Sequence, residues 1–359
     1  KFSDLFGCPV RKPEKDLLTQ FHMDIAASIQ AVLEEIFLRL AKSLSSEYKI
    51  PNICLAGGVA LNCVANGKLH RSGLFKNIWI QPAASDAGGA LGAALALWYK
   101  ELNNNRKIST TDDMRGSYLG PQFKQDEIEK ELKNMGAVFE KFSEDKMIKK
   151  TAEALSEEKA IGWFQGRMEF GPRALGARSI IADPRSATMQ KKLNLKVKYR
   201  ESFRPFAPSI LRECASDWFD LDIDSPYMLL VSDVKKNIRR EMTSDEKKLF
   251  GIDKLNIVRS SIPSVTHVDY SARIQTVHKE TNPLYYNLIL KFNELTKCPV
   301  IINTSFNVRG EPIVCSVEDA FKCFMGTKLD MLVCGNFILY KSKQNPKLYE
   351  NYKNKYSLD

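Results

Sequence analysis

Helical and extended sequence patterns alternate along the first hundred residues, and this alternation limits the chain to an α/β fold. Apolar side chains recur every three or four positions through residues 17–48, which is the spacing of a long amphipathic helix. A short apolar run, a glycine turn and further alternating patterns follow. The expected elements are a helix over 17–48, strands at 52–56 and 77–81, a helix ending near 71 and another beginning at Asp86.

The length of 359 residues favours two domains of ordinary size. We expect residues 1–105 to form the first domain, 106–115 a polar linker, 116–343 the second domain and 344–359 a polar surface tail. Only two strands are expected before residue 100, too few for a stable sheet between helices, and the chain begins at Lys1 rather than a methionine. These observations predict that the front of the first domain is missing.

The second domain continues the alternation. A strand at 160–164 leads into the most arginine-rich run of the chain. The other expected elements are helices over 125–134, 146–157 and 283–296, strands at 137–142, 227–231 and 300–302, and a final helix and strand within 317–340.

The net charge of +10 is concentrated, which argues against a nucleic-acid-binding face and favours a local anion pocket. Residues 162–204 hold ten basic side chains against three acidic ones, most of the excess of the whole chain. The eight cysteines form no C-x-x-C pair, so we expect reduced core residues. The most apolar stretch, 87–98, is shorter than a membrane span. We therefore expect a cytoplasmic protein that does not enter the membrane.

Three arginines, Arg167, Arg173 and Arg178, lie among glycines in residues 162–179. Glycine lets the backbone approach a ligand, and guanidinium forks bind phosphate or carboxylate oxygens. Ser179 adds a hydroxyl donor, and together these groups suit the oxygens of a phosphate. The spacing matches neither the G-x-G-x-x-G motif nor the Walker lysine loop. The alternative is a solvated loop whose arginines pair with surface acids.

A second basic run follows, in which Lys198 and Arg204 flank an acidic and aromatic segment. Proline restricts itself and its predecessor, so Pro205 holds Arg204 in an extended conformation with little entropy left to lose on binding. An ordinary basic strand face is the alternative.

Two further polar segments are candidates for ligand contacts. Asn303, Ser305 and Asn307 come just after a buried strand, where open α/β sheets bind ligands, although a plain turn explains them equally. Residues 267–275 alternate as a strand does, and a solvent-facing edge strand would explain their polar side equally well. The side chains on that face are His267, Asp269, Ser271, Arg273 and Gln275.

In the first domain, a strand leads into a turn at Gly57 and Gly58, and a helix that includes Asn62 follows. The backbone amides at the N-terminus of this helix suit an anion. Close packing at the glycines is the alternative. Asp86 lies at a helix start, where capping is the default role, and a metal would need partners. The four histidines contain no i, i+4 pair, so the sequence completes no metal site.

Six segments together resemble the O-carbamoyltransferase family, of the nodulation protein U, cephalosporin carbamoyltransferase and tobramycin carbamoyltransferase type. They occur in order from about residue 55 to 335, so the resemblance covers most of the chain, which would be the C-terminal part of such a protein. The segments are LAGGVALN, SDAGGALGAA, WFQGRMEFGPRALGARSI, ESFRPFAPSIL, HVDYSARIQTV and NTSFNVRGEPIV.

The resemblance implies a partial actin/sugar-kinase-like domain followed by a YrdC-like twisted α/β domain. It implies that the YrdC-like domain converts carbamoyl phosphate and ATP, with Mg²⁺, into carbamoyl-adenylate, and that the other domain transfers the carbamoyl group to the hydroxyl of a small molecule. The catalytic residues that it implies are Arg173, Lys198 and Arg204. The implied contacts to nucleotide or carbamoyl phosphate are Arg167, Arg178, Ser179, Arg273, Asn303, Ser305 and Asn307, with Gly57, Gly58 and Asn62 binding nucleotide in the transferase domain.

Asp86 resembles the family's aspartate ligand to an Fe²⁺ ion, whose histidine ligands lie in a region that this sequence does not contain. Metal binding and the transfer step are therefore in question for this chain, and adenylate formation alone is one alternative. A tRNA threonylcarbamoyl-related protein and an inactive nucleotide-binding remnant are others. A hydrogenase-maturation carbamoyltransferase would carry C-x-x-C pairs, which are absent. A homodimer is compatible with the sequence.

Overall fold

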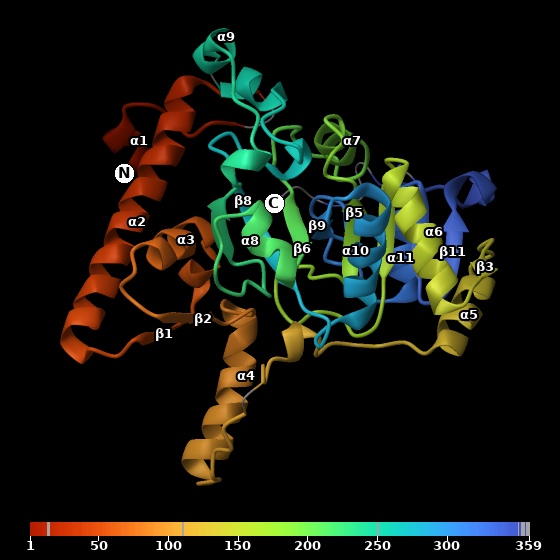
Figure 1. Ribbon diagram of the computed structural model, residues 1–359, viewed down its shortest axis with the longest axis horizontal. Helices are drawn as coiled ribbons and strands as arrows, with labels where there is room; N and C mark the ends of the chain where they lie inside the picture. Colours follow the sequence, from red (N-terminus) through yellow and green to blue (C-terminus); the bar gives the residue numbers. More distant parts are fainter. Residues whose placement is uncertain (13–14, 110, 250, 351, 353–355, 357–359) are drawn as a thin grey trace.

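A nine-stranded mixed sheet forms the centre of the computed structural model, which describes residues 1–12, 15–109, 111–249, 251–350, 352 and 356 (Figure 1). Its strands are β3 (Glu140–Lys141), β4 (Ile161–Phe164), β5 (Arg178–Ala182), β6 (Ala207–Leu211), β7 (Leu230–Asp233), β8 (Ser271–Val277), β9 (Val300–Ser305), β10 (Met331–Cys334) and β11 (Phe337–Tyr340). The order is β3-β11-β10-β4-β5-β9-β6-β8-β7, with β10–β4 and β6–β8 parallel and the other pairs antiparallel. The expected α/β class is confirmed.

Helices cover this sheet, and two of them begin and end where the sequence predicts. Asn282 caps the helix that starts at Pro283, because its Oδ1 accepts from the Tyr285 N–H at 3.1 Å. The helices are α5 (Gln125–Asn134), α6 (Glu144–Ser156), α7 (Met189–Lys196), α8 (Ala215–Trp218), α9 (Ser244–Lys248), α10 (Pro283–Thr296) and α11 (Val317–Gly326). Of these, α10 packs beside α6 and against β6 and β9, which fixes the centre of the sheet (Figure 1).

Two expectations about strands need correction, and two further strands were not expected. Strand β9 continues through Asn303 to Ser305 because it pairs with β5 on one side and β6 on the other, so these residues lie in the sheet rather than beyond it. Strand β8 lies between β6 and β7, so the edge-strand explanation of its polar face is wrong. Strands β5 and β6 were not expected, because the first follows a glycine-rich run and the second contains Pro208.

The first part of the chain contains α1 (Phe2–Phe6), α2 (Gln20–Tyr48), β1 (Asn52–Leu55), α3 (Cys63–Arg71), β2 (Asn77–Ile80) and α4 (Asp86–Ala96). Its two strands pair in parallel, as a sheet of their own. Helix α3 lies between α2 and the large sheet (Figure 1). The amphipathic pattern of α2 is confirmed as a helix, but its apolar side chains at Ile29, Val32, Ile36 and Leu40 are exposed.

Helix α3 anchors this first part to the edge strand β7. A Cβ on Gly67 would lie 2.1 Å from the Val231 carbonyl oxygen, so only glycine allows this approach. Beside it, Asn66 donates to the Leu229 carbonyl at 3.0 Å, and Arg71 donates to the Val231 carbonyl at 3.0 Å. The two parts of the chain therefore share a packed junction.

Most described residues of the expected surface tail are exposed, with two buried exceptions. Gln344 and Tyr352 are buried, and the Tyr352 ring occupies the space where a Cβ on Gly326 would lie. The chain therefore packs against the end of α11 at this point. Of the helices in the described ranges, none combines the length and the apolar character that a bilayer crossing requires.

Candidate functional site

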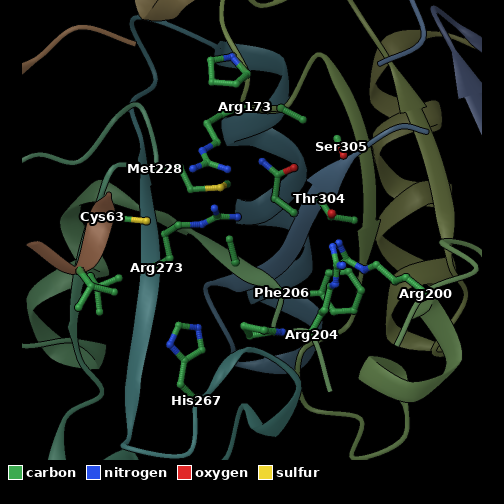
Figure 2. A pocket seen from close by; sticks show the side chains of 17 residues that line it. Cys63, Arg173, Arg200, Arg204, Phe206, Met228, His267, Arg273, Thr304 and Ser305 are labelled. Carbon is green, nitrogen blue, oxygen red and sulfur yellow. The ribbon is translucent and has the colours of Figure 1, made fainter. Parts of the chain in front are cut away.

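A cavity of about 370 Å³ lies where the first part of the chain meets the large sheet, and we call it the arginine cavity. Cys63 and Val64 line it from α3, and residues of the large sheet and its loops line the rest (Figure 2). The lining residues are Cys63, Val64, Pro172, Arg173, Ala174, Arg200, Arg204, Pro205, Phe206, Ala207, Met228, Val231, His267, Arg273, Asn303, Thr304 and Ser305.

Four arginines converge on this cavity. Arg173 and Arg273 point into the same space, and Arg200 approaches from the opposite side near Phe206 (Figure 2). Of these four arginines, only Arg204 has an ion pair among the described residues, with Glu201 at 3.0 Å, and Arg309 shares that carboxylate at 3.2 Å. Guanidinium groups donate hydrogen bonds and accept none, so the cavity presents an excess of positive donors.

Burial and the nearness of other cations both lower the pKa values of these arginines. Burial, together with Arg273, lowers the pKa of Arg173 to about 10. Burial and the nearby Arg204 and Arg273 lower the pKa of Arg200 to about 10 as well. Arg173 has one weak bond, to the Leu61 carbonyl at 3.5 Å, and its buried Nε has no partner among the described residues. An anion placed between the guanidiniums would offset the repulsion between these cations and would give the Arg173 Nε a hydrogen-bond acceptor.

The loop that carries Arg173 is organised by a buried carboxylate. Glu169 Oε1 accepts from the backbone N–H of Leu175 at 2.6 Å and of Ala177 at 2.8 Å. Gly171 has a φ of 137°, and a Cβ there would lie 2.8 Å from the Pro82 carbonyl oxygen of the first part. Gly171 therefore allows the shape of the loop and its close packing against the first part of the chain, and the loop in this shape directs Arg173 into the cavity.

The other arginines of that run lie elsewhere. Arg178 is fully buried, its two Nη groups donate to backbone carbonyls, and its guanidinium stacks 3.6 Å from the Phe164 ring centroid. Ser179 is buried and its Oγ accepts from the Gly176 N–H at 3.0 Å. Arg167 is exposed and donates to the Gly120 carbonyl at 3.2 Å. None of the three lines the arginine cavity.

Lys198 lies behind the cavity wall rather than in it. Its Nζ donates to Asn307 Oδ1 at 2.7 Å, to the Asn307 carbonyl at 2.9 Å and to Ser305 Oγ at 3.1 Å. Burial, with Arg200 nearby, lowers the pKa of Lys198 to about 7. Ser305 lines the cavity and Asn307 does not, so Lys198 fixes the end of β9 from behind.

His267 is a cavity residue that the sequence suggested only as part of a polar face. Its Nδ1 lies 3.0 Å from Ser271 Oγ, which lies 2.7 Å from Asp269 Oδ1. Because the carboxylate only accepts, Ser271 donates to it and accepts from the Nδ1–H, which leaves Nε2 as the bare ring nitrogen. Burial, with Arg273 and Arg259, lowers the pKa of His267 to about 4.

Arg200 was also missed as a site residue. It stands two positions after Lys198 in the same basic run, so the sequence did contain a signal, but the strand and loop geometry decides which of the basic side chains faces the cavity. Its Nε donates to Asn194 Oδ1 at 2.7 Å, and its guanidinium lies 5.1 Å from the Phe206 ring centroid. These contacts hold the remaining donors toward the cavity.

The candidates in the first part lie outside the arginine cavity. Gly57 and Gly58 form an exposed turn before α3, and a Cβ on either would have no atom within 4 Å. Asn62 caps α3, since its Oδ1 accepts from the Ala65 N–H at 3.0 Å, and it also bonds Gln30. Asp86 is exposed in the first turn of α4. The described residues contain no cluster of three His, Cys, Asp or Glu side chains, so Asp86 does not complete a metal site there.

A second cavity of about 990 Å³ lies beside β2 and α4. Apolar and aromatic side chains, among them Trp79, Leu91 and Tyr227, form much of its wall. Side chains of both charges also line it, Arg106 and Lys107 together with Asp112, Asp113 and Asp224, whereas the described lining of the arginine cavity contains no carboxylate.

Comparison with known proteins gives a consistent result along the chain. The family model for the carbamoyltransferase N-terminus matches residues 1–95, and the model for the carbamoyltransferase C-terminus matches residues 152–341. A solved structure of full-length HypF in the phosphate- and nucleotide-bound form is 18% identical, covering 51% of this chain and 20% of that one. Its TM-score is 0.32, which is too low for a comparison of folds.

Curated relatives cover nearly all of this chain. An uncharacterized protein of Synechocystis, sll1178, is 60% identical over 96% of this chain and 56% of its own length. Nodulation protein NolNO of Sinorhizobium fredii is 42% identical over 91% of this chain and 45% of its own, and nodulation protein U of Rhizobium tropici is 32% identical over 89% and 49%. The chain spans about half the length of these relatives. From the two matching family models, it belongs to the carbamoyltransferase family.

Proposed function

We propose that the arginine cavity binds carbamoyl phosphate and ATP, and that the chain belongs to an enzyme transferring the carbamoyl group to a small-molecule hydroxyl. The observation that carries the proposal is the convergence of four guanidiniums on one cavity whose described lining contains no carboxylate. Both substrates are oxygen-rich anions, which guanidinium forks bind bidentately. Membership of the carbamoyltransferase family supports the choice of the carbamoyl group.

The proposed chemistry has three steps. Water cleaves carbamoyl phosphate into carbamate, phosphate and a proton. A carbamate oxygen then attacks the α-phosphorus of ATP, pyrophosphate leaves, and carbamoyl-adenylate forms. Finally the acceptor hydroxyl attacks the carbamoyl carbon, AMP leaves, and the hydroxyl proton passes to solvent. Because charge moves among phosphate oxygens in the first two steps, the contribution of the protein is charge neutralisation and positioning.

The residues have separate proposed roles. Arg173, Arg204 and Arg273 hold phosphate oxygens, and Arg200, fixed by Asn194, joins them from the opposite wall. Ser305 contacts the carbamoyl or adenylate group from the end of β9. Lys198 acts through Ser305 and Asn307, to which it donates, rather than by touching the substrate. Arg178 and Ser179 support the loop that presents Arg173.

The domain assignment is part of the proposal. Residues 116–343 would form the YrdC-like, adenylate-forming domain and 1–105 part of the actin/sugar-kinase-like transferase domain, with 106–115 between them. The order of the two family-model matches supports this division. Gly57 and Gly58 would bind nucleotide in the transferase domain, from the turn that precedes α3. A homodimer and a cytoplasmic location stay predictions.

The proposal includes Mg²⁺ but assigns no role to Fe²⁺. Mg²⁺ would be bound by the phosphate oxygens of ATP. The described side chains that line the cavity offer it only neutral oxygens, those of Asn303, Thr304 and Ser305. Fe²⁺ does not fit at Asp86 among the described residues, where no cluster of metal-binding side chains surrounds it. No step is therefore assigned to iron.

The test is pyrophosphate exchange into ATP that depends on carbamoyl phosphate. We expect exchange with the unaltered chain and a loss of at least about 30-fold with Arg204→Ala or Arg173→Ala, because each leaves phosphate charge unpaired. Arg39→Ala, an exposed arginine on α2 paired with Glu35, is the matched control and should exchange normally. Exchange that needs no carbamoyl phosphate and is equal in all variants would overturn the proposal.

A further inference from the structure

Arg173 projects from the tip of a short loop whose two ends are both tied to the rest of the fold. Before the tip, the Phe170 backbone N–H donates to the Ser117 carbonyl at 2.7 Å. After the tip, the Leu175 carbonyl accepts from the Tyr118 hydroxyl at 2.7 Å. The position of the Arg173 guanidinium therefore depends on how the few residues between these two ties are held.

The Glu169 side chain crosslinks the base of this tip. Its Oε1 accepts from the backbone N–H groups of Leu175 and Ala177, at 2.6 and 2.8 Å. One carboxylate oxygen thus joins the chain that enters the tip to the chain that leaves it. Glu169 is buried and does not line the arginine cavity, so it can affect a ligand there through the tip but not by contact.

A carboxylate in this place is costly to bury. Burial raises the pKa of Glu169, although the hydrogen bonds from Leu175 and Ala177 and the nearby Arg178 oppose that rise. Its second oxygen, Oε2, is buried and has no hydrogen-bond partner among the described residues. Buried polar atoms without partners lower stability, and they are expected at functional or strained sites rather than in an ordinary core.

We propose that Glu169 is a positioning residue of the anion site: by holding two backbone N–H groups on one oxygen, it fixes where Arg173 presents its guanidinium and so sets the affinity for phosphate. This inference rests on the proposed function and deepens it. A guanidinium binds phosphate oxygens through a rigid fork, so a displaced tip weakens both bonds of the fork. Arg200 enters the cavity from the opposite side and is held by Asn194 instead (Figure 2).

The experiment measures the affinity for inorganic phosphate by titration calorimetry on two variants of Glu169. Glu169→Asp keeps the charge but withdraws the oxygens by one methylene, so the crosslink is lost and we expect binding about fivefold weaker. Glu169→Gln keeps an oxygen at the place of Oε1 and removes the charge, and we expect an affinity within about twofold of that of the unaltered chain. The pair separates the placement of the acceptor from its charge.

Two further backgrounds decide whether the effect passes through Arg173. In Arg173→Met the guanidinium is absent, so adding Glu169→Asp should weaken phosphate binding by less than about 1.5-fold. In Arg200→Met, which removes a donor that Glu169 does not hold, the same substitution should still weaken binding about fivefold, because independent effects add. General damage to the cavity would instead weaken binding equally in both backgrounds.

Amide hydrogen exchange provides the test if Glu169→Asp does not fold. In the unaltered chain, phosphate should slow exchange of the Leu175 and Ala177 N–H groups, because the ligand and the carboxylate then hold the same tip from two sides. In Arg173→Met, phosphate should leave their exchange unchanged. Exchange that ignores phosphate in the unaltered chain would overturn the positioning role.

The possible results separate this inference from the proposed function. Full phosphate affinity in Glu169→Asp would overturn the positioning role and leave the anion site standing. The role is also overturned if Glu169→Gln loses as much affinity as Glu169→Asp, or if Glu169→Asp has its full effect in Arg173→Met. Failure of the unaltered chain to bind phosphate would overturn the proposed function itself.

Discussion

The arginine cavity and the protein layer behind it both contain buried cations, but the two regions satisfy them differently. Behind the cavity, the Nη groups of Arg178 donate to four backbone carbonyls, and Arg259 donates to four others. In the cavity, Arg273 has no hydrogen bond among the described residues and Arg173 has one weak bond. The number of carbonyl partners, rather than burial, therefore separates structural arginines from those available to a ligand.

This difference has a thermodynamic consequence. A structural arginine contributes to the free energy of unfolding, because removing it leaves several buried carbonyls without donors. A cavity arginine is buried close to other cations, and burial together with those cations lowers the pKa of Arg173 and of Arg200 to about 10. Its removal should therefore cost ligand affinity and little stability, and substitutions in the two regions can test this distinction.

The largest effect is expected for Arg178→Met. The substitution keeps the stem that packs on Phe164 but removes the donors to the carbonyls of Gln165, Gly166 and Pro121. We expect the free energy of unfolding to fall by about 4 kcal/mol in urea denaturation. A loss below about 1 kcal/mol would contradict the structural role.

Arg173→Met is the matched substitution in the cavity. We expect the affinity for carbamoyl phosphate to fall about 50-fold, or about 2.3 kcal/mol, because phosphate oxygens lose a charged donor in a buried site. The free energy of unfolding should change by less than about 1 kcal/mol, since the side chain has one bond of 3.5 Å to lose. If Arg173→Met unfolded as readily as Arg178→Met, the distinction between the two regions would fail.

The third prediction concerns pH and His267, which faces the cavity but is tied to the layer behind it through Ser271. Its pKa of about 4 lies below the unfolded value near 6.5, so the unfolded chain binds the proton first as pH falls. Stability present above pH 6.5 should therefore decline between pH 6.5 and 4, by about 2 kcal/mol at pH 4.5. Unfolding measured across this range with His267→Gln should show a shallower decline; parallel curves would be inconsistent with a buried neutral imidazole.

The smallest effect is expected for Glu201→Gln at the cavity rim. Glu201 pairs with Arg204 and Arg309, and all three side chains are partly exposed, so the pairs contribute at most about 1 kcal/mol to stability. Removing the carboxylate should free Arg204 and tighten inorganic phosphate binding about two- to threefold, measured by calorimetry. Weaker binding would mean that Glu201 positions Arg204 instead of competing for it.

Much of the fold follows from local sequence patterns. Helices α5 and α10 begin and end where periodicity places them; at their starts the Glu127 carboxylate accepts from the Lys124 backbone N–H, and Asn282 Oδ1 accepts from the Tyr285 N–H. Strands were harder to find. Strand β6 contains Pro208, and β5 follows directly on a glycine-rich loop, so neither displays the alternation that marks a strand. Both are strands because neighbours distant in sequence pair with them.

The sequence predicted the chemistry of the site, an anion pocket, better than it predicted which side chains face the cavity. Excess positive charge in residues 162–204 points to an anion pocket, and the cavity contains Arg173 and Arg204 from that segment. The same charge count cannot distinguish Arg178, which points into the protein, from Arg200, which points into the cavity. Arg273 and Asn303 join them only because β8, β6 and β9 are adjacent in the sheet.

The sequence by itself determined the α/β class, the long helices, the concentration of positive charge and the resemblance to carbamoyltransferases, because these depend on local periodicity, composition and short motifs. The tertiary structure decided which cations are left without carbonyl partners, which nitrogen of His267 is bare and which atom of the Asn303 amide has a hydrogen-bond partner. These properties depend on hydrogen bonds between residues far apart in the chain, such as Gln275 to Leu175. No local pattern encodes such bonds, since each is fixed only when the sheet has assembled.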